Sequence, residues 1–179
     1  MIFVSFYTPA YEPHAVKLMR SLERWQLDYD IEERPQTAGW CATCATKPAY
    51  ILAKRNEYDG PLVWVDADAT VDRDPIILRE GYDADIAVHY RDGHELLSGT
   101  IWIGDTPGAR DLLHRWSAAC QRDPGVWDQR TLQKIVESGA YRVAQLPAAY
   151  VAIYDAKMSD NPVITHWQAS RQSRKVVGH

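Results

Sequence analysis

The sequence has few cysteines and no long apolar run. Its three cysteines form one CxxC pair, Cys41 and Cys44, and a separate Cys120. A structural zinc site needs four ligands at suitable spacing, and no second pair follows, so we expect reduced thiols. No apolar segment approaches the ~18 residues that span a bilayer, and the N-terminal MIFVSFYTPA lacks the regions of a signal peptide. We therefore expect a soluble, cytoplasmic protein without a transmembrane segment.

Excess positive charge is also missing. The 179 residues carry a formal net charge of −4, so the basic surface that nucleic-acid binders need is not expected. Hydrophobic residues make up 46% of the chain, which includes seven tryptophans and ten tyrosines. This is enough apolar volume for one core, with aromatic residues left for a ligand cleft. We predict a single domain over residues 1–179, with a basic tail from about residue 170.

The hydrophobic pattern predicts alternating strands and helices. A strand, a helix, a strand, a helix and a strand follow one another within the first 65 residues. This order indicates a layered α/β fold with a mixed, mainly parallel sheet flanked by helices. We predict strands at residues 2–7, 29–34, 62–65, 85–90, 97–103, 141–144 and 163–167, helices at 14–25, 46–58, 107–122 and 128–138, and a loop at 36–45.

Two carboxylates follow the central predicted strand, in the stretch VWVDADATV at residues 63–71. Side chains alternate along a strand, so Asp66 and Asp68 share a face with Trp64. A carboxylate inside a sheet covered by helices is strongly destabilising, so we expect the chain to leave the sheet at Asp66. Open α/β sheets bind ligands at the carboxyl ends of their strands. Two hard oxygen ligands there suit Mn²⁺ or Mg²⁺ bound together with substrate phosphates.

Two other interpretations of this stretch are open. It also fits the DxDxT motif of haloacid-dehalogenase-type phosphatases, in which Asp66 would be the nucleophile. That chemistry needs a lysine and a second acidic motif downstream. No lysine lies between Lys54 and Lys134, and Gly104-Asp105 follows Asp66 too closely for the intervening sheet. The other interpretation is a solvated turn after a strand.

An ordered set of motifs gives the chain a family resemblance. In chain order these are Lys47-Pro48 at a helix start, Asp66-Ala67-Asp68, Ser98-Gly99-Thr100, Trp127-Asp128-Gln129 and Thr165-His166-Trp167. Over roughly residues 2–174 the chain resembles the GT-A glycosyltransferases, the nucleotide-diphospho-sugar transferases with a DxD motif. The resemblance implies a GT-A-like (Rossmann-like) fold. It also implies transfer of a sugar from a nucleotide-diphosphate donor, a UDP- or GDP-sugar, to an unknown acceptor.

The resemblance further implies roles for particular residues. Asp66, Asp68 and His166 would hold the Mn²⁺ or Mg²⁺ that bridges the donor diphosphate. Asp128 and Gln129 would lie beside the sugar and its anomeric carbon. The residues that would contact the donor are Thr8, Tyr11, Lys47, Asp66, Ser98 and Gly99.

Several of these residues have a structural explanation as well. Lys47 lies in the first turn of a helix, where the macrodipole disfavours a cation unless an anion such as a diphosphate is near. The alternative is a surface lysine. Asp128 is a good N-cap for the helix that follows it. Tyr11 and His166 can be packing residues.

Rival functions also remain open. A nucleotidyltransferase of the same fold would show a glycine-rich basic loop after the first strand, whereas residues 8–14 contain neither glycine nor lysine. A non-catalytic nucleotide-sugar-binding module is another alternative. Retention and inversion are not distinguished, because inversion needs a general base near the acceptor and the spacing singles out none of Asp105, Asp128 and Glu95. The basic residues near the C-terminus could clamp the diphosphate or form a solvated tail; these are Arg171, Arg174 and Lys175.

Overall fold

A six-stranded sheet lies at the centre of the computed structural model, which describes residues 1–37 and 39–169. Its strands, in spatial order, are β2 (Tyr29–Glu33), β1 (Ile2–Tyr7), β3 (Leu62–Val65), β6 (Glu95–Ile103), β5 (Ile86–Arg91) and β7 (Val143–Gln145). Strand β6 is antiparallel to its neighbours β3 and β5, whereas the other pairs are parallel. The mixed, mainly parallel sheet predicted from the sequence is therefore confirmed.

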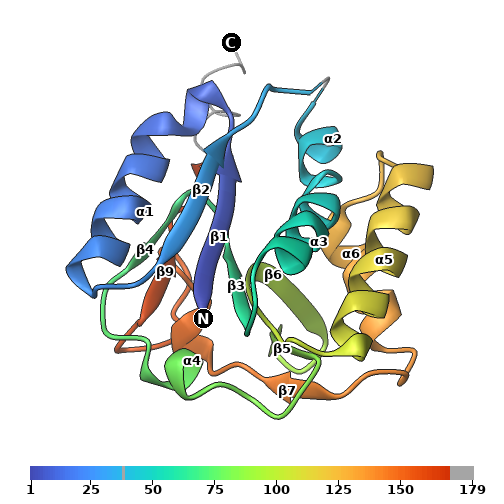
Figure 1. The fold of residues 1–179 in the computed structure, drawn as a ribbon. Coiled ribbons are helices and arrows are strands. Elements are labelled where there is room, and N and C mark those ends of the chain that lie inside the picture. Colours follow the sequence, from blue (N-terminus) through green and yellow to red (C-terminus); the bar gives the residue numbers. More distant parts are fainter. Residues whose placement is uncertain (38, 170–179) are drawn as a thin grey trace.

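Helices cover both faces of this sheet (Figure 1). They are α1 (Glu12–Arg24), α2 (Trp40–Cys44), α3 (Lys47–Glu57), α4 (Ile76–Glu80), α5 (Pro107–Arg122) and α6 (Asp128–Val136), with two 3-10 turns, η1 (Pro9–Tyr11) and η2 (Ala148–Tyr150). One core cluster contains Phe3 of β1 and Leu18 of α1. The other contains Val4 of β1 and Ile51 of α3. Because Phe3 and Val4 are consecutive and point to opposite faces, both faces of the central strands are buried. This explains why β3 is apolar along its whole length.

A second, three-stranded sheet lies beside the carboxyl end of β3. It has the order β4-β9-β8, formed by β4 (Ala69–Val71), β9 (Ile164–His166) and β8 (Ala152–Ile153). Strand β9 is antiparallel to β4, and this pairing sets Ala69 opposite His166. The late strand therefore brings His166 to the segment that follows the two aspartates. We predicted β9 but not β4 or β8, because two or three residues are too short to show a periodic pattern.

The region between β2 and α3 differs from the sequence prediction. We predicted a loop over residues 36–45, but the chain forms the short helix α2 there. Gly39 precedes it with an extended backbone, and the backbone N–H of Thr43 donates to the carbonyl of Gly39. One helical turn cannot display a 3.6-residue period, so the pattern gave no signal.

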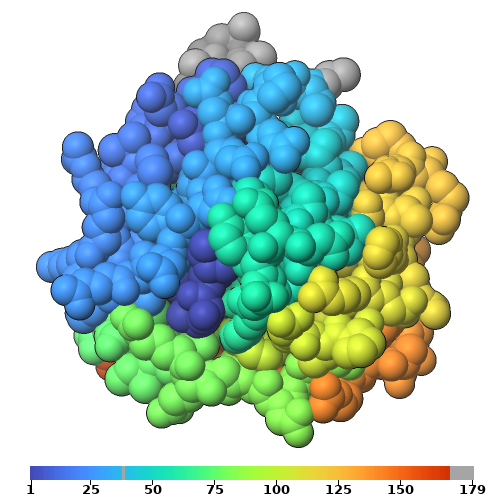
Figure 2. Space-filling model, viewed as in Figure 1, coloured from blue at the N-terminus to red at the C-terminus, as the bar shows by residue number. Residues whose placement is uncertain are grey.

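The described segments pack against each other without a linker. In the space-filling view, the segments coloured blue to teal and those coloured yellow to orange meet in one continuous surface (Figure 2). Across residues 1–37 and 39–169, no helix combines the length and the apolar character needed to cross a bilayer. The predicted basic tail, with Arg171, Arg174 and Lys175, lies outside the described residues. A single domain over residues 1–179 stays a prediction.

Candidate functional site

Strand β3 ends where the two aspartates begin. The backbone N–H of Asp66 donates to the carbonyl of Gly99 over 2.8 Å, which fixes the point where the chain turns out of the sheet. The indole Nε1 of Trp64 donates to Oδ1 of Asp66 over 2.9 Å. The predicted shared face of Trp64 and Asp66 is thus confirmed. The carboxylate of Asp66 is partly exposed, as a group that meets a ligand must be.

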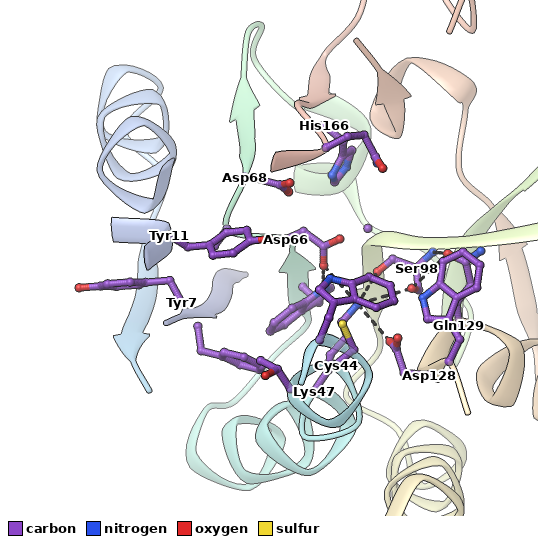
Figure 3. A pocket seen from close by; sticks show the side chains of 18 of the residues that line it. Tyr7, Tyr11, Cys44, Lys47, Asp66, Asp68, Ser98, Asp128, Gln129 and His166 are labelled. Carbon is purple, nitrogen blue, oxygen red and sulfur yellow. Dashed lines mark hydrogen bonds and ion pairs between the residues drawn. The ribbon is translucent and has the colours of Figure 1, made fainter. Parts of the chain in front are cut away.

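Asp66, Asp68 and His166 form a cluster of potential metal ligands (Figure 3). One ligand atom from each lies within 4.8 Å of the other two. Asp68 is held in place by the backbone N–H of Ala169, which donates to its Oδ2 over 2.7 Å. Burial and the neighbouring Asp66 raise the pKa of Asp68, so this pair of acids favours a cation between them. Two carboxylates and an imidazole are a donor set that fits Mn²⁺ or Mg²⁺.

The imidazole of His166 is buried and its position is constrained. Burial lowers its pKa, although the two aspartates oppose this effect, so the ring is neutral near pH 7. A neutral imidazole is the form that can bind a metal. The hydroxyl of Thr100 lies 2.9 Å from Nε2, and the backbone of Gly99 lies against the ring. His166 is thus buried and hydrogen-bonded, and it also belongs to the acidic cluster.

Lys47 lies between two carboxylates. Its Nζ is 3.2 Å from Oδ1 of Asp66 and 3.1 Å from Oδ2 of Asp128, and it is 5.2 Å from the ring centroid of Trp64. The residue is only 5% exposed, so the surface-lysine alternative is wrong. Burial alone would lower the pKa of the ammonium, but Asp128 and Asp66 raise it, so it stays charged. The helix macrodipole disfavours the positive charge of Lys47 at this helix N-terminus. The carboxylates of Asp66 and Asp128 offset that unfavourable interaction.

Asp128 is the first residue of α6 and its side chain is 1% exposed. The N-cap is Trp127, so the predicted capping role of Asp128 is wrong. Its carboxylate instead points to Lys47, and the described residues give its Oδ1 no hydrogen-bond donor. Burial raises the pKa of this carboxyl, while Lys47 opposes the rise. A buried acceptor without a donor is destabilising unless a ligand supplies one.

The amide of Gln129 is fixed at both ends. Its Oε1 accepts from the backbone N–H of Ser98 over 3.1 Å, and its Nε2 donates to Oε1 of Glu95 over 3.3 Å. Glu95 also pairs with Arg91. The side chain of Gln129 therefore has one orientation, with the amide nitrogen and oxygen assigned by their partners.

All the predicted site residues line one cavity of about 300 Å³. Tyr7 is the last residue of β1, and Tyr11 follows that strand. Figure 3 shows both side chains on the opposite side of this cavity from Asp128 and Gln129. The predicted set comprises Thr8, Tyr11, Lys47, Asp66, Asp68, Ser98, Gly99, Asp128, Gln129 and His166. Asp105 is excluded as a base near this cavity, because it lies elsewhere and pairs with Arg110.

Sequence reasoning missed several residues of the cavity wall. Trp40 and Trp127 both line it, with their ring centroids 6.0 Å apart. Trp127 precedes the Asp128-Gln129 pair, which was a usable signal, whereas nothing in the sequence marked Trp40. Cys44 also lines the wall, and burial raises the pKa of its thiol to about 12. All three cysteines are free thiols, as expected.

Comparison with known proteins identifies the family. The sequence profile described as nucleotide-diphospho-sugar transferase matches residues 19–177, which is most of the chain. The chain belongs to the nucleotide-diphospho-sugar transferase family. It is therefore a glycosyltransferase, and family membership favours sugar transfer over the phosphatase interpretation of DxDxT. No curated protein matches the sequence.

Solved structures confirm the GT-A fold of this transferase. A glycosyltransferase involved in glycosylation of the major capsid of PBCV-1 has a TM-score of 0.75 at 15% identity, with 97% of each chain covered. GlyE of Streptococcus pneumoniae TIGR4 has a TM-score of 0.64 at 15% identity, with 93% of this chain and 54% of that chain covered. The galactosyltransferase LgtC, solved with donor and acceptor sugar analogues, has a TM-score of 0.56 at 11% identity, with 97% and 94% covered. At these identities the likeness concerns the fold.

Proposed function

We propose that this transferase binds a UDP- or GDP-sugar together with Mn²⁺ or Mg²⁺ in the cavity at the end of β3. The observation that carries the proposal is the convergence of Asp66, Asp68 and His166 to within 4.8 Å of one another. When bound, the cation neutralises the negative charge that develops on the departing diphosphate. Asp66, Asp68 and His166 are the residues that hold it.

The sugar of the donor lies toward Asp128 and Gln129. Oδ1 of Asp128 is a buried acceptor without a protein donor, so it suits a sugar hydroxyl. Lys47 joins this end of the cavity to the metal end, because it pairs with both Asp128 and Asp66. Ser98 and Gly99 line the same cavity and are the backbone that the sugar approaches.

The nucleoside lies at the other side of the cavity. Thr8 and Tyr11 follow β1 there, and Tyr11 is placed to contact the base or the ribose. Catalytic roles are assigned to Asp128 and Gln129, which flank the position of the anomeric carbon. Retention and inversion of the anomeric configuration are both compatible with this assignment.

Calorimetric titration tests this proposal. UDP, GDP and a panel of their sugar derivatives are titrated into the protein with Mn²⁺, with Mg²⁺ and with EDTA. We expect one nucleotide to bind only when a divalent cation is present, and its sugar derivative to be hydrolysed slowly. Equal affinity in EDTA would contradict the metal assignment.

The alternative function is a nucleotide-sugar-binding module without turnover. Tight, metal-dependent binding with neither hydrolysis nor transfer to any acceptor would favour it. The cytoplasmic location is likewise a prediction, and cell fractionation of the native host tests it.

A further inference from the structure

One part of the cavity wall is neutral and aromatic. It consists of Gln36, Trp40, Thr43 and Cys44, which precede α3, and Trp127 at the start of α6. None of these side chains carries a charge at neutral pH, since burial raises the pKa of the Cys44 thiol to about 12. The charged side chains that line the cavity, Lys47, Asp66, Asp68 and Asp128, belong instead to the metal and donor-sugar regions described above.

Trp40 is exposed although it is one of the largest apolar side chains. It is 38% exposed, and among the exposed large apolar residues of the described chain it is the one that lines the cavity. Part of its side chain is therefore accessible to a molecule bound in the cavity. Ligand sites are commonly lined by aromatic side chains with a few polar groups among them.

The rings of Trp40 and Trp127 form one corner of the cavity. Their centroids lie 6.0 Å apart with the ring planes inclined by 51°, so the rings touch and present two joined surfaces. Trp127 is directly followed by Asp128, which places this corner next to the proposed site of the donor sugar. A pyranose has an apolar face of C–H groups, and an indole ring presents a negative face that attracts such groups.

We propose that Trp40 and Trp127 bind the acceptor, and that this acceptor is a neutral sugar stacked on the two indole rings. This inference rests on the proposed function, because it assigns the donor to the charged part of the same cavity. A nucleotide diphosphate does not suit a neutral wall. Among the lining residues that the structure describes, Lys47 is the one lysine or arginine, and it is already paired with Asp66 and Asp128, so these residues leave no unpaired cation for an anionic acceptor.

Titration with neutral glycosides tests this assignment. Methyl glycosides of glucose, galactose, mannose and N-acetylglucosamine are titrated by saturation-transfer NMR, with and without UDP and Mn²⁺. Methyl glucuronide is the anionic comparison. We expect at least one neutral glycoside to bind, and Trp40→Ala to weaken it about tenfold or more, because tryptophan contacts dominate many binding sites. Trp40→Phe, which keeps an aromatic ring, should lose less.

The matched control is Ile76→Ala. Ile76 is a large apolar residue that is 55% exposed but does not line the cavity, so this variant should bind glycoside and UDP normally. UDP affinity in the presence of Mn²⁺ should also be unchanged in Trp40→Ala. A matching loss of UDP affinity would place Trp40 in the donor site and overturn the inference. Tighter binding of the glucuronide, or no binding of any neutral glycoside, would overturn it as well.

The two proposals fail separately. If neither UDP nor GDP binds with Mn²⁺ or Mg²⁺ but a glycoside binds in a Trp40-dependent manner, the donor assignment is wrong and the sugar site stands. If UDP binds with Mn²⁺ and Trp40→Ala leaves glycoside binding unchanged, the donor assignment stands and the acceptor assignment is wrong.

Discussion

The backbone of Gly99 lies against the imidazole ring of His166. A Cβ atom at Gly99 would be 2.8 Å from Cε1 and 3.0 Å from Nδ1 of the ring. No real side chain fits at those distances, so the glycine sets the position of the proposed third metal ligand.

Gly99→Ala should displace His166 and weaken Mn²⁺ binding. We expect about a tenfold loss of metal-dependent UDP affinity, as for other changes that misplace a ligand. Calorimetry measures the affinity, and circular dichroism checks the fold. Gly125→Ala is the control, because its nearest neighbour would lie 3.6 Å away. Normal UDP affinity in Gly99→Ala would argue against His166 as a ligand.

Asp68→Asn should abolish metal-dependent donor binding and leave the fold intact. The carboxylate of Asp68 accepts one backbone hydrogen bond, which an asparagine oxygen can still accept, but the charge that attracts the cation is lost. Asp92→Asn is the matched control. Asp92 is exposed and has a φ of 53°, a conformation that asparagine tolerates well. Donor binding by Asp68→Asn in Mn²⁺ with wild-type affinity would refute the metal site.

Lys47→Met should destabilise the protein. Removal of the ammonium leaves Asp128 buried without a partner, which costs about 3–5 kcal/mol for a buried pair of this kind. The double variant Lys47→Met/Asp128→Asn should recover much of this loss, because no buried charge is left unpaired at Asp128. Urea unfolding of the two single variants and the double variant measures the coupling. If the stability losses of the two single variants add up to the loss of the double variant, the pair contributes no coupling energy.

Glu95 should act by positioning Gln129. Glu95→Leu removes the acceptor of the Gln129 amide, whereas Glu95→Gln can still accept that hydrogen bond. We expect Glu95→Leu to lower the rate of donor hydrolysis about tenfold to a hundredfold, as small misplacements do. UDP affinity should stay unchanged, and Glu95→Gln should restore most of the rate. A loss of UDP affinity equal to the loss of rate would indicate a general structural effect instead.

Asp85 should make the free energy of unfolding depend on pH in the acidic range. Burial alone would raise its pKa, but hydrogen bonds from Thr106 and Arg142 lower it below the ordinary value. A carboxyl with a lowered folded pKa stabilises the protein above its unfolded pKa of ~3.9, and this stability is lost as the pH falls through the folded value. Asp85→Asn should therefore cost about 1–3 kcal/mol at pH 7 and progressively less below about pH 4. Urea unfolding of the wild type and of Asp85→Asn, at pH 7 and below about pH 4, measures the difference in their free energies of unfolding. A difference that stays constant with pH would contradict the prediction.

The sequence predicted where the two aspartates leave the sheet, because the signals for that point are local. The buried run of β3 ends at Asp66, and strand alternation puts Asp66 on the face of Trp64, which their hydrogen bond confirms. It predicted the late strand of His166 but not β4, which pairs with it, because three residues show no period. The family resemblance supplied the rest of the proposed metal cluster.

The errors concern residues whose roles depend on distant partners. Asp128 has the chemistry of an N-cap, but Lys47 from another helix pairs with its carboxylate and the cap passes to Trp127. Trp40 lies in a single helical turn within a predicted loop, and only tertiary packing brings its ring to Trp127. Local pattern cannot report such contacts.

The antiparallel pairing of β9 with β4 also constrains when the protein becomes able to act. Asp68 and Ala169, joined by a hydrogen bond across this pairing, are 101 positions apart in the sequence. During synthesis the chain therefore makes both acidic ligands long before the histidine leaves the ribosome. A nascent chain that ends before β9 lacks His166, so under the proposed function metal-dependent nucleotide binding would begin only after β9 has been synthesised.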